Sequence, residues 1–182
     1  LQFIRELVRV QSVTGEEKGG AEFMAKAMEA LGLRVQVDEV ELGRSNVVGV
    51  LKGEVGRPVL ILNGHIDTVP PGDRNLWKVD PFSAEEMDGM IYGRGAADMK
   101  GGLASMLGAI KAIKALGLRL RGDLVFQAVI DEERGGHKGT RRLLLEKGIV
   151  GDYAIVGEPT NLEVQIAHKG DLGVEIITRG KA

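Results

Sequence analysis

Short runs of apolar residues predict the strands of this chain. The runs over residues 59–65, 123–130 and 153–156 are nearly continuous, and each ends at glycine or polar residues, which is typical of buried strands. Residues 33–40 alternate between apolar and polar side chains, so they predict a half-exposed strand. Residues 46–51 predict a further strand beside it.

Apolar residues at helical spacing predict two helices near the start of the chain. The first covers residues 1–10. Before the second, Thr14 and Glu17 stand three positions apart, which is the spacing of a capping box and predicts a helix start. Gly32 predicts the end of this second helix.

The second half of the chain continues the alternation of strands and helices. The glycine-rich residues 93–102 open a long helix that ends at Gly117, and a shorter helix is expected over residues 140–147. Residues 70–95 form a long irregular loop, and residues 164–177 resemble two more strands. Buried strands separated by helices predict an α/β fold with a largely parallel central sheet.

Composition and charge narrow the class of protein. The 182 residues carry 24 basic and 26 acidic side chains, well mixed, and the formal net charge of −2 argues against a nucleic-acid partner. No cysteine is present, which excludes disulfides within the chain and fits a cytoplasmic location. No apolar run approaches the ~20 residues that span a bilayer, so no membrane partner is expected. The start at Leu1 and the end at Ala182 indicate a piece of a longer protein.

Acidic or histidine side chains follow each of the three predicted buried strands. His65 and Asp67 follow the first strand, Glu132 and Glu133 follow the second, and Glu158 follows the third. Because the carboxyl ends of parallel strands meet at one edge of a sheet, we expect these groups to converge. His65 and Asp67 are two positions apart, so on an extended chain they point to the same side.

Asp98 joins this set from the glycine-rich loop. Taken singly, each residue has a plain structural explanation: Asp98 as a helix cap, His65 as a core histidine, and the glutamates as solvated turn residues. Taken together, five carboxylates in one crevice would repel one another strongly. One or two divalent cations would cancel that repulsion.

One histidine with several carboxylates suits zinc, cobalt or manganese better than calcium, which prefers shells made only of oxygen. A carboxylate can bridge two ions, and two such ions form a hydrolytic arrangement that generates hydroxide and polarises a carbonyl. One acidic residue must then stay off the metals as a general base. Glu132 and Glu133 are adjacent, so on an extended backbone they would face opposite ways, one as a ligand and one as a base.

Four motifs occur in order along the chain: Gly-His-Ile-Asp-Thr-Val-Pro at 64–70, Gly-Arg-Gly-Ala-Ala-Asp-Met-Lys-Gly-Gly at 93–102, Asp-Glu-Glu at 131–133 and Gly-Glu-Pro-Thr at 157–160. They resemble the dinuclear zinc aminoacylase/carboxypeptidase metallopeptidase family, and within it the acetylornithine deacetylase and succinyl-diaminopimelate desuccinylase group. The resemblance implies a three-layer α/β/α, zinc-exopeptidase-like catalytic domain that is incomplete in this chain.

The resemblance also implies a ligand set for two divalent ions, with zinc favoured and cobalt or manganese as alternatives. By this resemblance His65 and Glu158 bind one metal, and Asp98 bridges both ions. Glu133 binds the second metal.

The same resemblance assigns the catalytic side chains. Glu132 is the general base, and Asp67 orients the imidazole of His65. The peptide bond that follows Asp98 is expected to be cis.

The chain departs from the family pattern at its carboxyl end. The family has an inserted lid domain that forms the homodimer, a lid histidine that stabilises the oxyanion, and a second metal-binding histidine beyond the lid. We expect residues 1–177 to be the amino-terminal part of the catalytic domain and residues 178–182 to begin the lid. His137 and His168 match neither histidine; His137 is expected in a surface loop, and His168 near the cleft.

Two functions from different classes remain open. The first is a metal-dependent amidohydrolase or exopeptidase, in which a metal-bound hydroxide attacks the amide bond of an N-acyl amino acid or a small peptide. The alternative is a non-catalytic, metal-stabilised binding or assembly domain on the same fold. Glu132 favours the enzyme, because a structural metal site has no need of a base beside a ligand. The identity of the acyl amino acid or dipeptide does not follow from these residues.

Overall fold

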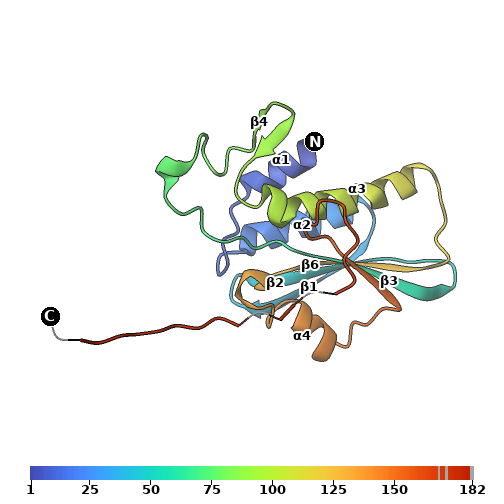
Figure 1. The fold of residues 1–182 in the computed structure, drawn as a ribbon. Helices are drawn as coiled ribbons and strands as arrows, with labels where there is room; N and C mark the ends of the chain where they lie inside the picture. The colour runs from blue at the N-terminus through green and yellow to red at the C-terminus, as the bar shows by residue number, and fades with distance from the viewer. Residues whose placement is uncertain (168, 171, 181–182) are drawn as a thin grey trace.

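The computed structural model describes residues 1–167, 169–170 and 172–180, and its centre is a five-stranded sheet (Figure 1). The strands lie in the order β1-β2-β6-β3-β7. Their bounds are Arg34–Glu41 for β1, Arg44–Leu51 for β2, Gly56–His65 for β3, Gly122–Val129 for β6 and Tyr153–Val156 for β7. All five predicted strands of the sheet are therefore confirmed within a few residues.

The sheet is mixed, with its parallel part where the polar strand ends lie. β3 pairs in parallel with both β6 and β7. β2 pairs antiparallel with β1 and with β6. Only two residues separate β1 from β2, and so short a connection can join only antiparallel neighbours. The predicted parallel arrangement thus holds for β6, β3 and β7, and the hairpin at the edge departs from it.

Helices cover both faces of the sheet, which confirms the three-layer α/β/α architecture (Figure 1). α1, α2 and α3 lie on one face and α4 on the other. Their bounds are Gln2–Arg9 for α1, Lys18–Ala30 for α2, Gly101–Ala115 for α3 and Thr140–Leu145 for α4. None of the helices in the described ranges combines the length and apolarity needed to cross a membrane.

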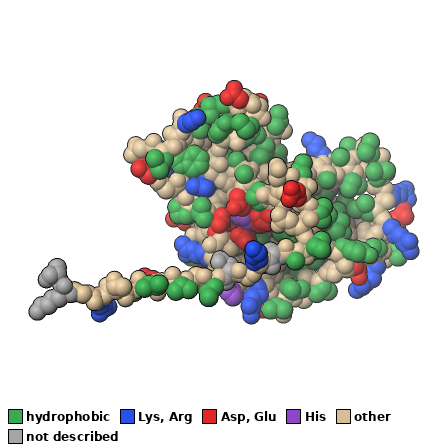
Figure 2. Space-filling view, in the orientation of Figure 1, with side chains coloured by type: hydrophobic (Ala, Val, Ile, Leu, Met, Phe, Trp, Pro, Cys, Tyr) green, Lys and Arg blue, Asp and Glu red, His purple; other side chains and the backbone are tan. Residues whose placement is uncertain are grey.

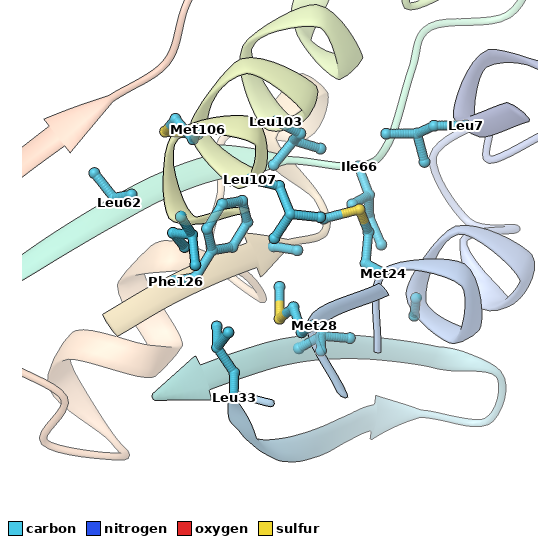
Figure 3. Close-up of a cluster of buried hydrophobic side chains, with 14 of the residues drawn as sticks. Leu7, Met24, Met28, Leu33, Leu62, Ile66, Leu103, Met106, Leu107 and Phe126 are labelled. Atoms are coloured by element: carbon cyan, nitrogen blue, oxygen red, sulfur yellow. The ribbon is translucent and has the colours of Figure 1, made fainter. Parts of the chain in front are cut away.

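The larger core lies between the sheet and the three helices (Figure 3). Leu103 and Leu107 of α3 are buried against Leu62 of β3 and Phe126 of β6. Each such buried side chain contributes about 1.5–3 kcal/mol relative to exposure. The apolar runs of β3 and β6 thus hold α3, and with it the loop before α3, over the centre of the sheet.

The long loop over residues 70–95 carries a little structure of its own. It contains a 3₁₀ turn, Arg74–Leu76, and a two-stranded sheet made of β4, Glu85–Met87, and β5, Met90–Tyr92. The indole nitrogen of Trp77 donates to the carbonyl of Pro71 at 2.8 Å. The predicted irregular loop is therefore an ordered lobe beside α1 (Figure 1).

The predicted capping box before α2 is wrong. α2 begins at Lys18 without a side-chain cap. The hydroxyl of Thr14 donates instead to the carboxylate of Asp67 at 2.9 Å, and Glu17 pairs with Arg44 at 2.6 Å. Tertiary partners therefore take both side chains away from the helix end.

The two strands expected over residues 164–177 are not formed in the described part of that segment. The chain there runs away from the sheet (Figure 1), and its apolar side chains, such as Ile166 at 96% exposure, face solvent. β7 is an edge strand, and Tyr153 and Ile155 on it are exposed, although we predicted a buried strand. A strand forms only where a neighbour accepts its backbone hydrogen bonds, and the described residues beyond β7 make no such ladder. His168 lies outside the described residues, and the domain boundary at residue 178 stays a prediction.

Candidate metal centre

His65 stands at the carboxyl end of β3 with its side chain 1% exposed. Its Nδ1 donates to the backbone carbonyl of Asp67 at 2.8 Å. Nδ1 therefore carries a proton, because a carbonyl can only accept. Nε2 is the ring nitrogen that faces the other partners, and a metal ion would bind it in its unprotonated form.

Two carboxylates face Nε2, the second nitrogen of this ring. Asp98 Oδ1 lies 2.9 Å from His65 Nε2, and Glu158 Oε1 lies 3.7 Å from it. One ligand atom from each of the three residues lies within 4.8 Å of the others. Figure 2 shows acidic side chains gathered around a histidine in a hollow of this face. The predicted convergence of these three residues is confirmed.

Asp98 lies in an irregular turn, Ala96–Lys100, that leads into α3. Its dihedral angles are not helical, and neither this turn nor α3 has a side-chain cap, so the explanation of Asp98 as a helix cap is wrong. The Asp98–Met99 peptide bond is cis, as the family resemblance implied. Met99 is fully buried in the core, and the buried ammonium of Lys100 donates to the carbonyl of Val10 at 2.7 Å. These two neighbours hold the turn from both sides.

Glu158 is held by the end of β7. The amide of Gly157 donates to the carbonyl of Asn63 at 3.0 Å, which extends the ladder between β3 and β7. On its other side Gly157 meets the first turn of α3: a Cβ added at Gly102 would lie 2.0 Å from the carbonyl oxygen of Gly157. The absence of a side chain at Gly102 therefore lets α3 approach the residue that precedes Glu158.

Glu132 and Glu133 follow β6 in a 3₁₀ turn, Glu132–Arg134, and not on the extended backbone that we predicted. Glu132 Oε2 lies 3.8 Å from His65 Nε2. The backbone amides of both glutamates point at Asp67 and donate to its carboxylate at 3.2 and 3.3 Å. The dipeptide is therefore brought to the histidine by its main chain.

Asp67 contacts His65 mainly through its carbonyl, since its carboxylate is 3.6 Å from Nδ1. The carboxylate also accepts the hydroxyl of Thr14 and the amides of Glu132 and Glu133. Burial opposes its ionisation, but the contact with His65 and these donors lower the pKa of Asp67. Asp67 therefore connects the histidine to the Glu132–Glu133 turn.

The charges of the cluster shift the pKa values of its members. Burial disfavours the imidazolium, but Asp67 and Glu158 outweigh burial and raise the pKa of His65 to about 9. Burial and the neighbouring carboxylates, Asp98 among them, raise the pKa values of Glu158 and Glu133, although the His65 charge partly offsets this. A cation at the cluster would relieve this repulsion, and a neutral imidazole with two carboxylates is a donor set that zinc and related ions accept. The residues fit a divalent metal ion.

Comparison with known proteins agrees with this geometry. Residues 61–179 match the model of peptidase family M20/M25/M40. The chain belongs to this family. It is 45% identical over 139 residues to the N-formyl-4-amino-5-aminomethyl-2-methylpyrimidine deformylase of Halalkalibacterium halodurans. This match covers 75% of this chain and 32% of the deformylase. It is 37% identical over 191 residues to the succinyl-diaminopimelate desuccinylase of Gluconacetobacter diazotrophicus. This match covers 99% of this chain and 49% of the desuccinylase.

A solved dipeptidase structure shares the fold. The match to human carnosine dipeptidase 1 has a TM-score of 0.74 at 26% identity, and it covers 85% of this chain and 37% of the dipeptidase. The chain thus spans about half the length of the desuccinylase and a smaller part of the other two relatives. The family and these relatives support a metal-dependent amide hydrolase, and they do not support the alternative of a non-catalytic binding domain.

Two residues of interest lie outside the three-residue cluster of this M20 chain. Glu133, the expected ligand of a second ion, does not belong to the group of ligand atoms within 4.8 Å found among the described residues. His137, expected in a surface loop, lies in a turn beyond Glu132 and Glu133 and is exposed, as predicted. The place of Glu133 in a second ion site stays a prediction.

Three polar residues that support the M20 site were missed by sequence reasoning. They are Thr14, which binds Asp67, Lys100, which binds the carbonyl of Val10, and Arg44, which binds Glu17. The sequence does carry a signal for Lys100, because a lysine directly after Met99 and before an apolar helix indicates a charged side chain at a buried position. Thr14 and Arg44 had none, because their partners are remote in sequence.

The contact between Gly102 and Gly157 leads to a first prediction. In the full-length M20 protein, Gly102→Ala should weaken zinc binding about tenfold or more, because the new methyl group must displace the residue before Glu158. It should also lower stability by about 1–3 kcal/mol through overpacking. Competition with a chelator and thermal unfolding measure the two effects.

Gly108→Ala is the matched control. Gly108 lies on the same helix, and a Cβ there has no atom within 4 Å. It should leave zinc affinity unchanged and stabilise the helix slightly, since alanine is the better helix former. Equal zinc affinity in Gly102→Ala and Gly108→Ala would contradict the role given to the close approach.

Proposed function

We propose that the protein containing this chain is a dinuclear zinc hydrolase that cleaves the amide bond of a small N-acyl amino acid or dipeptide. The observation that carries this proposal is the cluster of His65, Asp98 and Glu158 with a further carboxylate, Glu132, beside it. Three side chains of the kinds that bind zinc, next to an acid that is free to move a proton, are what amide hydrolysis requires.

In this proposal His65, Asp98 and Glu158 hold one ion, and Asp98 and Glu133 hold the other. Cobalt or manganese would suit the same donors. When bound, the ions lower the pKa of a water molecule and polarise the substrate carbonyl. Asp67 keeps the His65 ring in the tautomer that leaves Nε2 unprotonated.

Glu132 moves the proton in this proposal. Its carboxylate is half-exposed and lies 3.8 Å from His65 Nε2, so it borders the cluster and remains open to substrate and water. It accepts a proton from water as the amide carbonyl is attacked, and it delivers that proton to the leaving nitrogen. The turn that carries Glu132 is fixed by the bonds of its amide to Asp67.

The names of the relatives support the proposed substrate class. One is a deformylase, one a desuccinylase and one a dipeptidase, and each name describes the release of a group from nitrogen. An N-acyl amino acid, with acetyl, formyl or succinyl as the acyl group, is the substrate that we propose first. We also propose that the whole protein is a cytoplasmic homodimer, as the family resemblance implies, and that residues 1–182 alone are inactive because they supply only Asp98 and Glu133 to the second ion.

The test is a substrate panel with the full-length protein. The zinc-loaded enzyme is incubated with N-acetyl, N-formyl and N-succinyl amino acids and with dipeptides, and the released amine is measured. We expect hydrolysis of at least one acyl amino acid, and none by residues 1–182 alone. Absence of hydrolysis across the panel by a folded protein with two bound ions would overturn the proposal.

A further inference from the structure

Arg44 is a buried arginine whose guanidinium contacts three carboxylates. Its side chain is 10% exposed. Nε and Nη2 donate to the two oxygens of Glu17 at 2.8 and 2.6 Å. Nη2 also donates to Asp131 Oδ1 at 3.3 Å, and Nη1 donates to Glu41 at 2.8 Å. The arginine therefore joins β2, the segment before α2 and the segment after β6.

Glu17 is the partner that orients this arginine. Its side chain is fully buried, and both of its oxygens accept from Arg44 in a paired contact. A guanidinium with one edge fixed in this way has its remaining N–H groups aimed in set directions. One of those groups points at Asp131.

Asp131 shapes the turn that carries Glu132 and Glu133. Its backbone is left-handed, with φ of 69°, a conformation that residues other than glycine adopt only occasionally. Its Oδ2 accepts the amide of Lys138 at 3.1 Å, and its carbonyl accepts the amide of Gly136 at 2.7 Å. The carboxylate of Asp131 also accepts from Arg44, which lies outside the turn. This contact connects the left-handed residue to the rest of the fold.

We propose that Arg44, oriented by Glu17, is a positioning residue that acts through Asp131 to place Glu132 and Glu133 at the metal cluster. The Glu132–Glu133 turn is then held from two sides, by Asp67 at the amides and by Arg44 at the residue before them. The expected effect on catalysis rests on the proposed function, because it depends on the roles proposed for Glu132 and Glu133. The placement of the turn by Arg44 and Asp131 does not depend on that function.

The chain offers a matched control for a purely structural ion pair. Arg142 of α4 binds Asp38 of β1 with the same paired geometry, at 2.8 and 3.3 Å, and Asp38 is 7% exposed. This guanidinium also donates to Glu146 at 2.6 Å. Arg142→Met should therefore cost stability without changing the turn after β6.

The experiment compares Arg44→Met, Asp131→Asn, their double variant and Arg142→Met in the full-length protein. Hydrogen exchange of the Glu132 and Glu133 amides is measured without metal or substrate, and kcat, KM and metal content are measured in the zinc-loaded enzyme. Arg44→Met should speed exchange of these amides about tenfold or more. It should lower kcat about 10–100-fold with a much smaller change in KM, because the base is displaced and the substrate contacts are not.

Coupling between the two residues gives a stricter test. Asp131→Asn should reproduce the effects of Arg44→Met on amide exchange and kcat, and the double variant should be little worse than either in these two measurements, because both weaken the contact between Arg44 and Asp131. Arg44→Lys should restore part of kcat. If Arg44→Met does not fold, Asp131→Asn and Arg44→Lys decide the matter by the same two measurements.

The proposal would be overturned if the Glu132 and Glu133 amides exchanged at the same rate in Arg44→Met as in Arg142→Met. Additive effects in the double variant would also overturn it. The exchange result does not depend on substrate. A failure of the proposed function, seen as unchanged turnover in Glu132→Gln, is therefore distinguishable from a failure of the Arg44 proposal.

Discussion

Glu132→Gln is expected to lower turnover of the full-length enzyme about 10²–10⁴-fold while leaving its metal content unchanged, because the amide cannot accept a proton. Glutamine keeps the size of the side chain, and the backbone amide that binds Asp67 is unaffected. The turn should therefore stay in place, and only proton transfer should be lost. Steady-state kinetics with the best substrate of the panel, together with elemental analysis, provides the measurement.

Glu133→Gln is the matched comparison, since it makes the same chemical change one residue along the same turn. If Glu133 binds the second ion, this variant should lose metal, and added zinc should restore part of its activity. Loss of metal in Glu132→Gln with full occupancy in Glu133→Gln would reverse the two assigned roles.

Removal of metal should abolish hydrolysis, and zinc or cobalt should restore it. Burial of the carboxylates around His65, together with their mutual repulsion, raises the pKa values of Glu158 and Glu133, and a cation would relieve that repulsion. Exhaustive chelation followed by stepwise addition of zinc, with ions per chain and activity measured at each step, tests this. Full activity in a verified metal-free sample would contradict the proposed mechanism.

The zinc affinity should also depend on pH. The metal-free His65 has a pKa of about 9, raised from 6.5, and a metal ion can bind only the neutral ring. Protons therefore compete increasingly for Nε2 as the pH falls below about 9, so affinity should weaken in that direction. Affinity that stays constant from pH 9 to pH 6 would contradict the place of His65 in the site.

Much of the site was predictable because it depends on local patterns. Residues such as His65 and Glu158 each follow a short apolar run, and the carboxyl ends of neighbouring parallel strands meet at one edge. Asp98 was predictable from the glycine-rich stretch before a helix. These features need only the strand positions and one topological rule to bring the residues together.

Other features were mispredicted because distant partners decide them. Thr14 and Glu17 have the spacing of a capping box, yet Asp67 and Arg44 bind their side chains. The apolar alternation of residues 164–177 favours strands, but the described part of that segment has no neighbouring strand. Local preference is weak compared with a buried ion pair or a backbone ladder, so tertiary contacts override it.

The sequence by itself determined the strands and helices, the metal-ligand types and the order of the motifs, because apolar periodicity and residue chemistry are local properties. Only the tertiary structure decided that Asp67 binds the amides of Glu132 and Glu133, and that Arg44 reaches Asp131 from 87 residues away. Such contacts depend on how β2, β3 and β6 are placed side by side. A charged side chain becomes a positioning residue only when folding buries it beside partners that no spacing along the chain reveals.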